Sequence, residues 1–438
     1  MASALLQSLL DEDALRATEV GVPTVAAAAR RASAQALLRD GLPRARDEAW
    51  KYTSLRALEQ RRYANGDVDA ATRAVDAGAF KLPGIDGARL VFVNGAFRAD
   101  LSTPPALDGL VVTSFADDVA ASLAPARDLD ADSAESRAEA FVRLNAALAG
   151  VGPVLRVAAG VHIEAPLHLV FAGAAAGADV AWQLRVLVEI GAGASLRLIE
   201  HHVAASANAH LGNFVAHYVL AAGARLDLVQ IQDTAAAATL IRRNDFRIDR
   251  DATLSMHTIE AGAQTMRHDL CVDLAGRGAR FVSRGVFALR SRQHADTHLV
   301  VTHAARDTAS DIAWRGVADE RARGVFHGAI TIAEGSDGAD AQLSNKNLLL
   351  SPQAEIDTQP VLEIYADEVK AAHGATVGQL DERALFYLRS RGIPRDTARR
   401  VLVGAFCNAM FDDLAPASLR AHMETLLATR LPQAGDAA

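Results

Sequence analysis

The sequence predicts a mainly β protein whose core is a right-handed parallel β-helix, a solenoid, with α-helical segments before and after it. Three observations predict this class. A turn-and-strand phrase recurs at near-constant spacing, the strands around it alternate apolar and polar residues, and the flanking segments show helical periodicity. The chain has 438 residues, of which 50% are apolar, so it can bury such an extended core.

The repeated phrase is a turn residue followed by Ala and a strand-like run. It occurs at spacings of 30, 28 and 27 residues, starting at Gly193, Gly223, Asp251 and Gly278. A weaker match to this repeat starts at Gln353. Each coil of a solenoid can bury its apolar edge only against its neighbours, so a near-constant period indicates this fold. An antiparallel sandwich, which also has turns at short intervals, stays open as the structural alternative.

The sequence divides into a first region, a repeat core and a last region, at residues 1–150, 151–369 and 370–438. We expect the first region to be mostly helical with short strands. Residues 46–58 have the pattern of an amphipathic helix, and residues 89–95 form a strand-like run that ends in the turn signal Asn-Gly. A further helix is expected over about 131–148.

Helical patterning resumes after the core and predicts three helices. Asp381 can cap the first helix, while Pro394 and Pro416 stand where a first helical turn tolerates proline. In the second helix we expect an inward face made of Val401, Leu402, Ala405, Phe406, Met410 and Leu414. This block either caps the open end of the solenoid or docks a partner, and the pattern leaves both roles open.

The charge balance predicts no nucleic-acid partner and no membrane partner. Lys and Arg number 45 against 53 Asp and Glu, which gives a formal charge of −8. The start lacks a basic segment and no stretch is apolar enough to span a bilayer, so we expect a cytoplasmic protein. Cys271 and Cys407 are too few to hold an iron–sulfur cluster by four thiolates. A chain of this kind that handles iron must share the ligands with a partner.

Two groups of histidines are candidates for a metal site: His201, His202, His210 and His217 in one, and His294, His298 and His303 in the other. Side chains alternate along a strand, so His201 and His202 should point to opposite faces, as should His298 and His303. Neither group is expected to form a chelate on one strand. The sequence also contains no nucleotide-binding loop and no motif for a hydrolytic nucleophile.

One long stretch resembles the signature of a known family. It runs over residues 343–378 and continues over 385–393 as LFYLRSRGI. Residues 323–328 (RGVFHG) and 46–53 (RDEAWKYT) are similar to further motifs of that family. The chain is thereby identified as a member of the SufB/SufD family. The phrase HGATVG at His373 resembles the SufD branch, whereas the SufB branch has Cys-Glu-His-Glu-Ala there and additional cysteines.

The resemblance implies a non-enzymatic scaffold subunit for iron–sulfur cluster assembly. It implies pairing with SufB through the β-helices and docking of the SufC ATPase on residues 370–438. It also implies no tightly bound cofactor in the isolated chain, with iron or an Fe–S cluster held transiently between SufB and SufD. Many relatives have Cys-Ser before the His-Gly pair, where this chain has Ala371 and Ala372. His373 is then the candidate metal ligand at the SufB interface.

Two other functions compete with this hypothesis. A β-helix polysaccharide-binding protein or enzyme would need a secretion signal and exposed aromatic platforms, yet aromatic residues make up 5% of the chain. A stand-alone His-dependent metalloenzyme would need stoichiometric metal in the isolated chain. The sequence also leaves open whether the isolated chain is a monomer or a homodimer.

Overall fold

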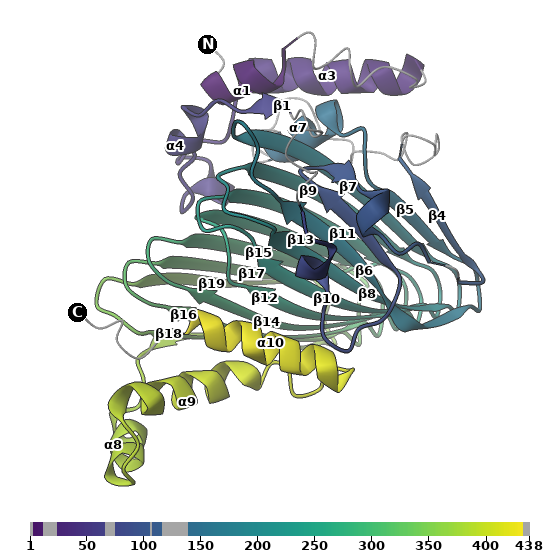
Figure 1. The fold of residues 1–438 in the computed structure, drawn as a ribbon. Coiled ribbons are helices and arrows are strands. Elements are labelled where there is room, and N and C mark those ends of the chain that lie inside the picture. The colour runs from purple at the N-terminus through teal and green to yellow at the C-terminus, as the bar shows by residue number, and fades with distance from the viewer. Residues whose placement is uncertain (1–2, 12–23, 66–74, 106, 116–138, 432–438) are drawn as a thin grey trace.

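Two long sheets packed face to face form the body of the protein (Figure 1). The computed structural model describes residues 3–11, 24–65, 75–105, 107–115 and 139–431. Along the chain, sheet A contains β1 (Ala64–Asn65), β4 (Leu110–Ser114), β5 (Pro153–Val157), β7 (Val180–Ile190), β9 (Leu211–Leu220), β11 (Thr239–Ile248), β13 (Thr265–Leu274), β15 (His294–His303), β17 (Arg323–Ile332) and β19 (Glu355–Ile364). Sheet B contains β2 (Arg89–Val93), β3 (Ala96–Phe97), β6 (His162–Gly173), β8 (Ser195–Ala204), β10 (Arg225–Asp233), β12 (Thr253–Glu260), β14 (Arg280–Leu289), β16 (Ala309–Ala318), β18 (Asp340–Leu349) and β20 (Lys370–Gly378).

Successive coils stack with their strands parallel, which confirms the predicted solenoid. From β5 onward the strands alternate between the two sheets, and strands two apart in sequence pair with each other. Ser195 pairs with Arg225 and Arg225 with Thr253, so the register follows the spacing of the repeat. Antiparallel pairs join only β2 to β3 and β4 to β5 among the described strands. The antiparallel sandwich is therefore excluded.

The repeated turn residues share a left-handed backbone. The φ angles are 64°, 69°, 56° and 74° at Gly193, Gly223, Asp251 and Gly278. Asp307 and Gly338 continue the series with φ of 59° and 79°. Glycine adopts this conformation freely and Asp tolerates it better than most residues, which explains the residue types of the repeat. Gln353 precedes β19 at the opposite edge of the solenoid, so it does not belong to the series.

Apolar side chains fill the space between the two sheets. On β8, Leu196 and Leu198 pack into this interior, while Ile199 points to the outer face of sheet B. Strand alternation thus gives every coil one face for the interior and one for an outer layer. The outer layers are supplied by the two ends of the chain.

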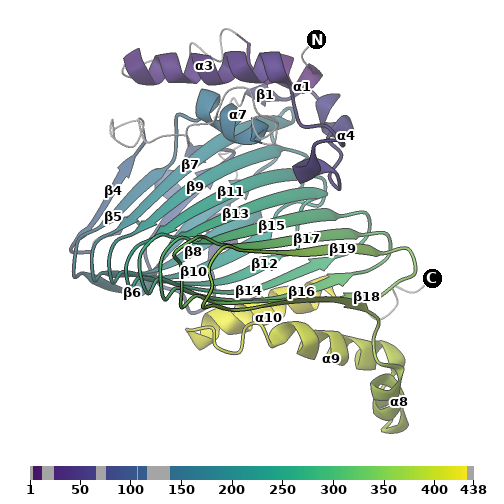
Figure 2. The ribbon, with the colours of Figure 1, turned by 180° about the vertical axis from the view of Figure 1, so that it is seen from behind.

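The N-terminal helices α1, α3 and α7 lie over the outer face of sheet A (Figures 1 and 2). The helices and short 3-10 turns of this region are α1 (Ala4–Leu9), α3 (Thr24–Asp40), η1 (Glu48–Trp50), α4 (Arg56–Glu59), η3 (Ala77–Phe80), η4 (Ala99–Leu101) and α7 (Ala140–Leu148). The helix expected over 131–148 is seen from Ala140, and residues 131–138 lie outside the described residues.

Residues 46–58 do not form the single amphipathic helix that the pattern predicted. They contain η1 and the start of α4, with an irregular stretch between. Trp50 packs against the guanidinium of Arg267, and the hydroxyl of Thr53 lies 2.7 Å from Nε2 of His294. These contacts with sheet A hold the segment against the solenoid, and tertiary contacts therefore override the local helical pattern.

The C-terminal region forms the three predicted helices α8 (Glu382–Ser390), α9 (Arg395–Asn408) and α10 (Ala417–Arg430). Asp381 caps α8 by accepting a hydrogen bond from the backbone N–H of Arg383, and α9 and α10 begin directly after Pro394 and Pro416. Helices α9 and α10 lie along the outer face of sheet B, and α8 extends away from it (Figure 2). Helices α9 and α10 therefore cover a side of the solenoid and not its open end.

The buried face of α9 differs from the expected one. Within α9, Val403 and Cys407 are buried against sheet B, whereas Val401 is 51% exposed and Ala405 is exposed. Met410 and Leu414, which follow α9, are buried as expected. The expected face is turned about the helix axis from the observed one, because the apolar residues of this segment form two adjoining stripes along the helix. The outward side chains of sheet B decide which stripe is buried.

The sheets extend beyond the core limits of 151 and 369 at both ends. Strand β2 already pairs in parallel with β6, and β20 continues the pairing of sheet B to Gly378. No helix within the described residues is long and apolar enough to cross a membrane.

Candidate functional site

His373 lies on the last strand of the solenoid. It is part of β20, where it pairs with Leu343 of β18, so it lies within the β-structure and not after it, as the expected core limit of 369 implied. The sequence missed this strand because its Ala- and Gly-rich residues have low strand propensity, and pairing with β18 imposes the extended backbone. Strand β20 is the edge of sheet B, as β19 is the edge of sheet A. His373 is exposed at this open end.

The register places His373 on the interior side of the last coil. Its partner Leu343 packs into the interior between the sheets, and paired residues of parallel strands point to the same face. The imidazole therefore belongs to the face that would be buried if another chain continued the solenoid.

The interior next to His373 contains buried polar side chains. Asn345 and Asn347 are buried on β18, on the same face as Leu343. The Asn345 carboxamide oxygen accepts a hydrogen bond of 2.8 Å from Thr358 on β19, and Asn347 donates one of 3.1 Å to the carbonyl of Thr376. Nδ2 of Asn345 and Oδ1 of Asn347 have no partner. Unmet buried polar atoms of this kind need a partner from water or another molecule.

The open end presents one imidazole, that of His373, as a candidate ligand. Neutral imidazole is a common ligand of iron, but a single side chain does not form a stable metal site. Throughout the described residues, no three His, Cys, Asp or Glu side chains form a group that could hold a metal ion. Ala371 and Ala372 carry no donor atoms. Iron bound here as cargo would therefore need further ligands from another chain.

The structure separates the first histidine group. His201 lies on the outer face of sheet B, stacked on His168 with ring centroids 5.4 Å apart. His202 points into the interior, where its Nε2 lies 2.9 Å from Glu200, so the predicted opposite faces are confirmed. His210 bonds to the carbonyl oxygen of Ala174 with its Nε2 at 2.7 Å, and it therefore holds a turn. The remaining member, His217, lies beside Asp245 on sheet A.

The second histidine group is divided in the same way. His294 and His298 lie on the outer face of sheet A, where the Nε2 of His298 is 3.0 Å from Asp296. His303 faces the interior between hydrogen-bond partners Thr308 and Ser310, at 2.8 and 2.9 Å. The alternation of faces is again confirmed, and each histidine has a local structural partner.

A fully buried polar network in the middle of the solenoid was missed by the sequence analysis. Glu200 is 0% exposed and lies between the sheets. Its oxygens accept hydrogen bonds from five side chains: His202 at 2.9 Å, Tyr218 at 2.6 Å, Gln230 at 3.3 Å, Arg242 at 2.5 Å and Asn244 at 3.3 Å. The sequence signal that could have revealed this network is a charged residue on the same strand face as apolar residues, as Glu200 is two residues after Leu198.

A second buried carboxylate extends this network. Glu260 accepts hydrogen bonds of 2.7 Å from Thr297 and lies 2.7 Å from Nδ1 of His268. The other ring nitrogen of His268 lies 2.9 Å from Oδ1 of Asn244, which links both carboxylates. The network spans several coils and is closed to solvent, so it ties the coils together and offers no site for a substrate.

These contacts determine which groups of the network are charged. Burial alone would raise the pKa of Glu200, but Arg242 and the hydrogen bond from His202 outweigh burial and hold that pKa well below its usual range. Burial and the adjacent Arg242 lower the pKa of His202 to about 4. At neutral pH the network therefore contains an ionised Glu200 beside a neutral His202.

Fold and site together define a parallel β-solenoid protein whose last coil has unpaired strand edges and an exposed imidazole. Two family models match the chain: SUF system FeS cluster assembly, SufBD core domain, over residues 171–406, and SufBD protein N-terminal region, over residues 9–169. The chain belongs to the SufBD family of iron–sulfur cluster assembly proteins. The resemblance seen in the sequence is thereby confirmed.

Curated relatives agree with this assignment. The iron–sulfur cluster assembly protein SufD of Escherichia coli (strain K12) is 31% identical over 400 residues, 91% of each chain. A SufBD family protein of Synechocystis sp., slr0076, is 28% identical over 89% of this chain and 87% of its own length. The iron–sulfur cluster assembly protein SufB of Bacillus subtilis is 25% identical over 66% of this chain and 61% of its own length. The chain is thus a SufD homologue.

Proposed function

We propose that this chain is the SufD subunit of a scaffold on which iron–sulfur clusters are assembled, together with SufB and the SufC ATPase. The observation that carries the proposal is the open end of the solenoid, where an exposed imidazole adjoins a polar interior. In this role the chain acts as a scaffold and performs no reaction of its own. Iron or a nascent cluster is the cargo, held transiently and not as a resident cofactor.

Pairing with SufB is supported by the edges of the last coil. Strands β19 and β20 each have one neighbour, so their outer backbone groups can pair with strands of another chain. Large apolar side chains are exposed at the same end, with Ile364 at 44%, Tyr365 at 63% and Val377 at 41%. A relative of the same fold could extend both sheets and bury these side chains. The cluster ligands missing from this chain would then come from SufB.

Docking of SufC is supported by helix α8. Phe386 is 71% exposed and Tyr387 is 57% exposed on this helix, which extends away from the solenoid. Leu385 is buried on its other side and anchors the helix. Exposed aromatic side chains on a projecting helix are typical of a helix that binds a groove of a partner.

Co-purification tests the proposal. The full chain is expressed with the SufB and SufC of its own organism, and the complex is isolated and assayed for ATPase activity, iron and acid-labile sulfide. We expect a stable complex that accumulates a cluster. Recovery of SufB and SufC without this chain, with unchanged cluster content, would reject the assignment.

A further inference from the structure

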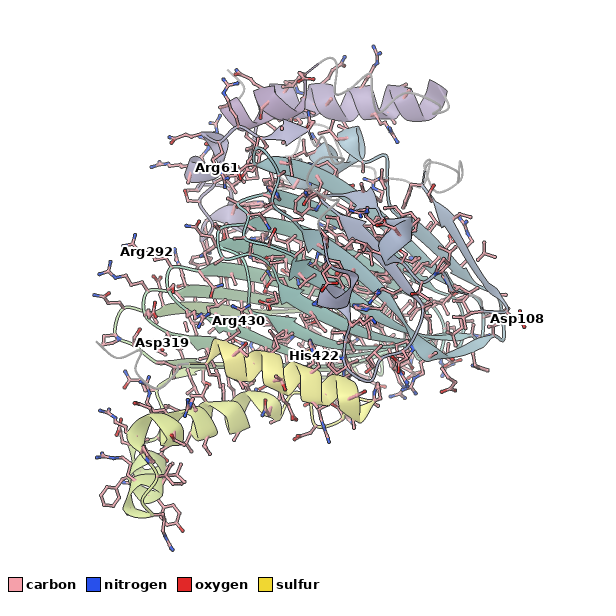
Figure 3. All side chains as sticks on the ribbon, in the orientation of Figure 1. Arg61, Asp108, Arg292, Asp319, His422 and Arg430 are labelled. Atoms are coloured by element: carbon pink, nitrogen blue, oxygen red, sulfur yellow. The ribbon has the colours of Figure 1, made fainter. Side chains whose placement is uncertain are left out.

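A groove of about 840 Å³ crosses one edge of the solenoid, where strands of sheet B lead into strands of sheet A. Its lining includes Arg290, Arg292, Arg321 and Arg430, and Glu320 is the carboxylate residue among them. We call it the arginine groove. Figure 3 shows Arg292 at the turn edge and Arg430 near the end of α10 on the same side of the molecule.

The opposite edge of the solenoid provides a comparison. Its turns also contain exposed arginines, but each is paired with an aspartate: Arg250 with Asp251 at 3.9 Å, Arg277 with Asp307 at 2.7 Å and Arg306 with Asp337 at 2.8 Å. In the arginine groove, Arg290, Arg292 and Arg321 form no ion pair with any described residue. The chain as a whole is acidic, so this local excess of positive charge is not a consequence of its composition.

The other groups in and near the groove do not neutralise its positive charge. Arg321 donates a hydrogen bond of 2.6 Å to the neutral amide of Gln353. Arg430 pairs with Asp233, but its Nε is buried without a hydrogen-bond partner. Asp319 is not part of the lining, and its carboxylate accepts a hydrogen bond of 2.8 Å from the backbone N–H of Glu320. Several guanidinium donors are therefore free for an anion.

We propose that the arginine groove binds a phosphate-bearing small molecule of about nucleotide size. A phosphate group offers up to three strong acceptor oxygens and two charges, which suits several guanidinium groups better than one carboxylate does. The volume lies within the range of about 300–1,000 Å³ that is usual for small-molecule sites. His373 and the residues of α8 are not part of the groove's lining, so this inference does not depend on the proposed scaffold function.

Titration calorimetry on the full chain at low ionic strength tests the proposal, with pyrophosphate and ADP as the probes. We expect saturable binding of both if phosphate is the recognised group, and of ADP more tightly if the site also contacts the nucleoside. Replacing Arg292 and Arg321 by Ala should weaken binding at least about tenfold, because two charge-assisted contacts are lost. The matched variant Arg250→Ala with Arg277→Ala, which has the same net charge, should bind within about twofold of the original chain.

A third variant is expected to gain affinity, which misfolding could not cause. Glu320→Gln removes the carboxylate of the lining and should strengthen pyrophosphate binding about two- to fivefold. Three results would overturn the proposal: no saturable binding of either probe, equal weakening in both double variants, or binding of a hexaglutamate peptide that pyrophosphate fails to displace. The last result would assign the groove to an acidic protein segment.

Discussion

Glu200 and Arg242 form an ion pair inside the solenoid in which both side chains are 0% exposed and Nη2 lies 2.5 Å from Oε1. The pair joins β8 of sheet B to β11 of sheet A, so it crosses the interior between the sheets. Nε and Nη1 of Arg242 have no hydrogen-bond partner, which makes Glu200 the main compensation for this buried cation.

Glu200→Gln should destabilise the protein by about 3 kcal/mol or more, because it leaves the charge of Arg242 buried and unpaired. Guanidinium unfolding followed by circular dichroism measures the change. The matched control is Glu189→Gln, whose partner is Arg156 and whose side chain is 42% exposed. That control should cost less than about 1 kcal/mol.

A double replacement separates the ion pair from the packing. Glu200→Leu with Arg242→Met removes both charges and should recover much of the loss. If Glu200→Gln proves as mild as Glu189→Gln, the interior at Glu200 is hydrated and the closed network is wrong.

Acid should destabilise the contact between sheet B and α10. His168 stacks on His201 beneath His422 of α10, with Nε2 of His168 3.3 Å from Nδ1 of His201. Burial lowers the pKa of His168 to about 3, and the nearby charges of Arg89 and His422 add to this effect. The folded state therefore keeps His168 neutral, while the unfolded state binds a proton below pH about 6.5.

The direction of the pH effect follows because the pKa of His168 is lower in the folded state than in the unfolded state. The stability that depends on neutral His168 is complete above pH about 6.5 and declines as the pH falls towards 3. Between pH 7 and pH 5 this residue should cost about 2 kcal/mol of unfolding free energy. His168→Gln should reduce the pH dependence by that amount, measured by unfolding at both pH values. The same change at the exposed His162 should leave it unaltered, and an equal effect of both would contradict the assignment.

The fold was largely predictable because its signals are local. The turn positions need a left-handed backbone, and that requirement appears in the sequence as Gly193, Gly223, Asp251 and Gly278. The C-terminal helices were predictable for a similar reason, since Asp381 and the two prolines mark their starts. The rotation of α9 was not predictable, because the side chains of sheet B select its buried face.

The site was predictable only in part. The resemblance implies His373 as a candidate ligand, which stays a prediction, and its place on a strand follows from pairing with Leu343, which no local pattern shows. Asn345 and Asn347 look like solvent-facing residues of a half-exposed strand until the register places them inside. Glu200 and Arg242 are far apart in sequence, and only the closed solenoid brings them together.

Helix α8 should control SufC binding without affecting stability. Phe386→Ala with Tyr387→Ala removes two exposed aromatic side chains, so the unfolding free energy should change by less than about 0.5 kcal/mol. Under the proposed function, SufC capture in a pull-down should fall at least about tenfold. Val401→Ala, at a similarly exposed position on α9, is the control. Unchanged capture by the double variant would remove α8 from the interface.

Truncation after Asp381 is a poorer test than these point variants. If the last region only docked a partner, the β-helix would be expected to stay folded without it. In the structure, α9 and α10 cover an outer face of sheet B that includes Ile231, Ile259 and Val286. Removing the helices would expose this apolar face, so we expect the truncated chain to aggregate, as light scattering would show.

His373→Ala should impair cluster assembly and leave the fold intact. The side chain is exposed at the end of the solenoid, so its loss creates no cavity and should change the unfolding free energy by less than about 0.5 kcal/mol. In the complex with SufB and SufC, iron and sulfide content should fall severalfold, because the one imidazole at the open end is lost. His162→Ala, an exposed histidine on β6 remote from this end, is the matched control and should load normally. Normal loading of the His373→Ala complex at native stoichiometry would reject the ligand role and leave His373 as a packing residue of the SufB contact. Loss of the complex itself, seen by gel filtration, would instead show that the imidazole acts in pairing.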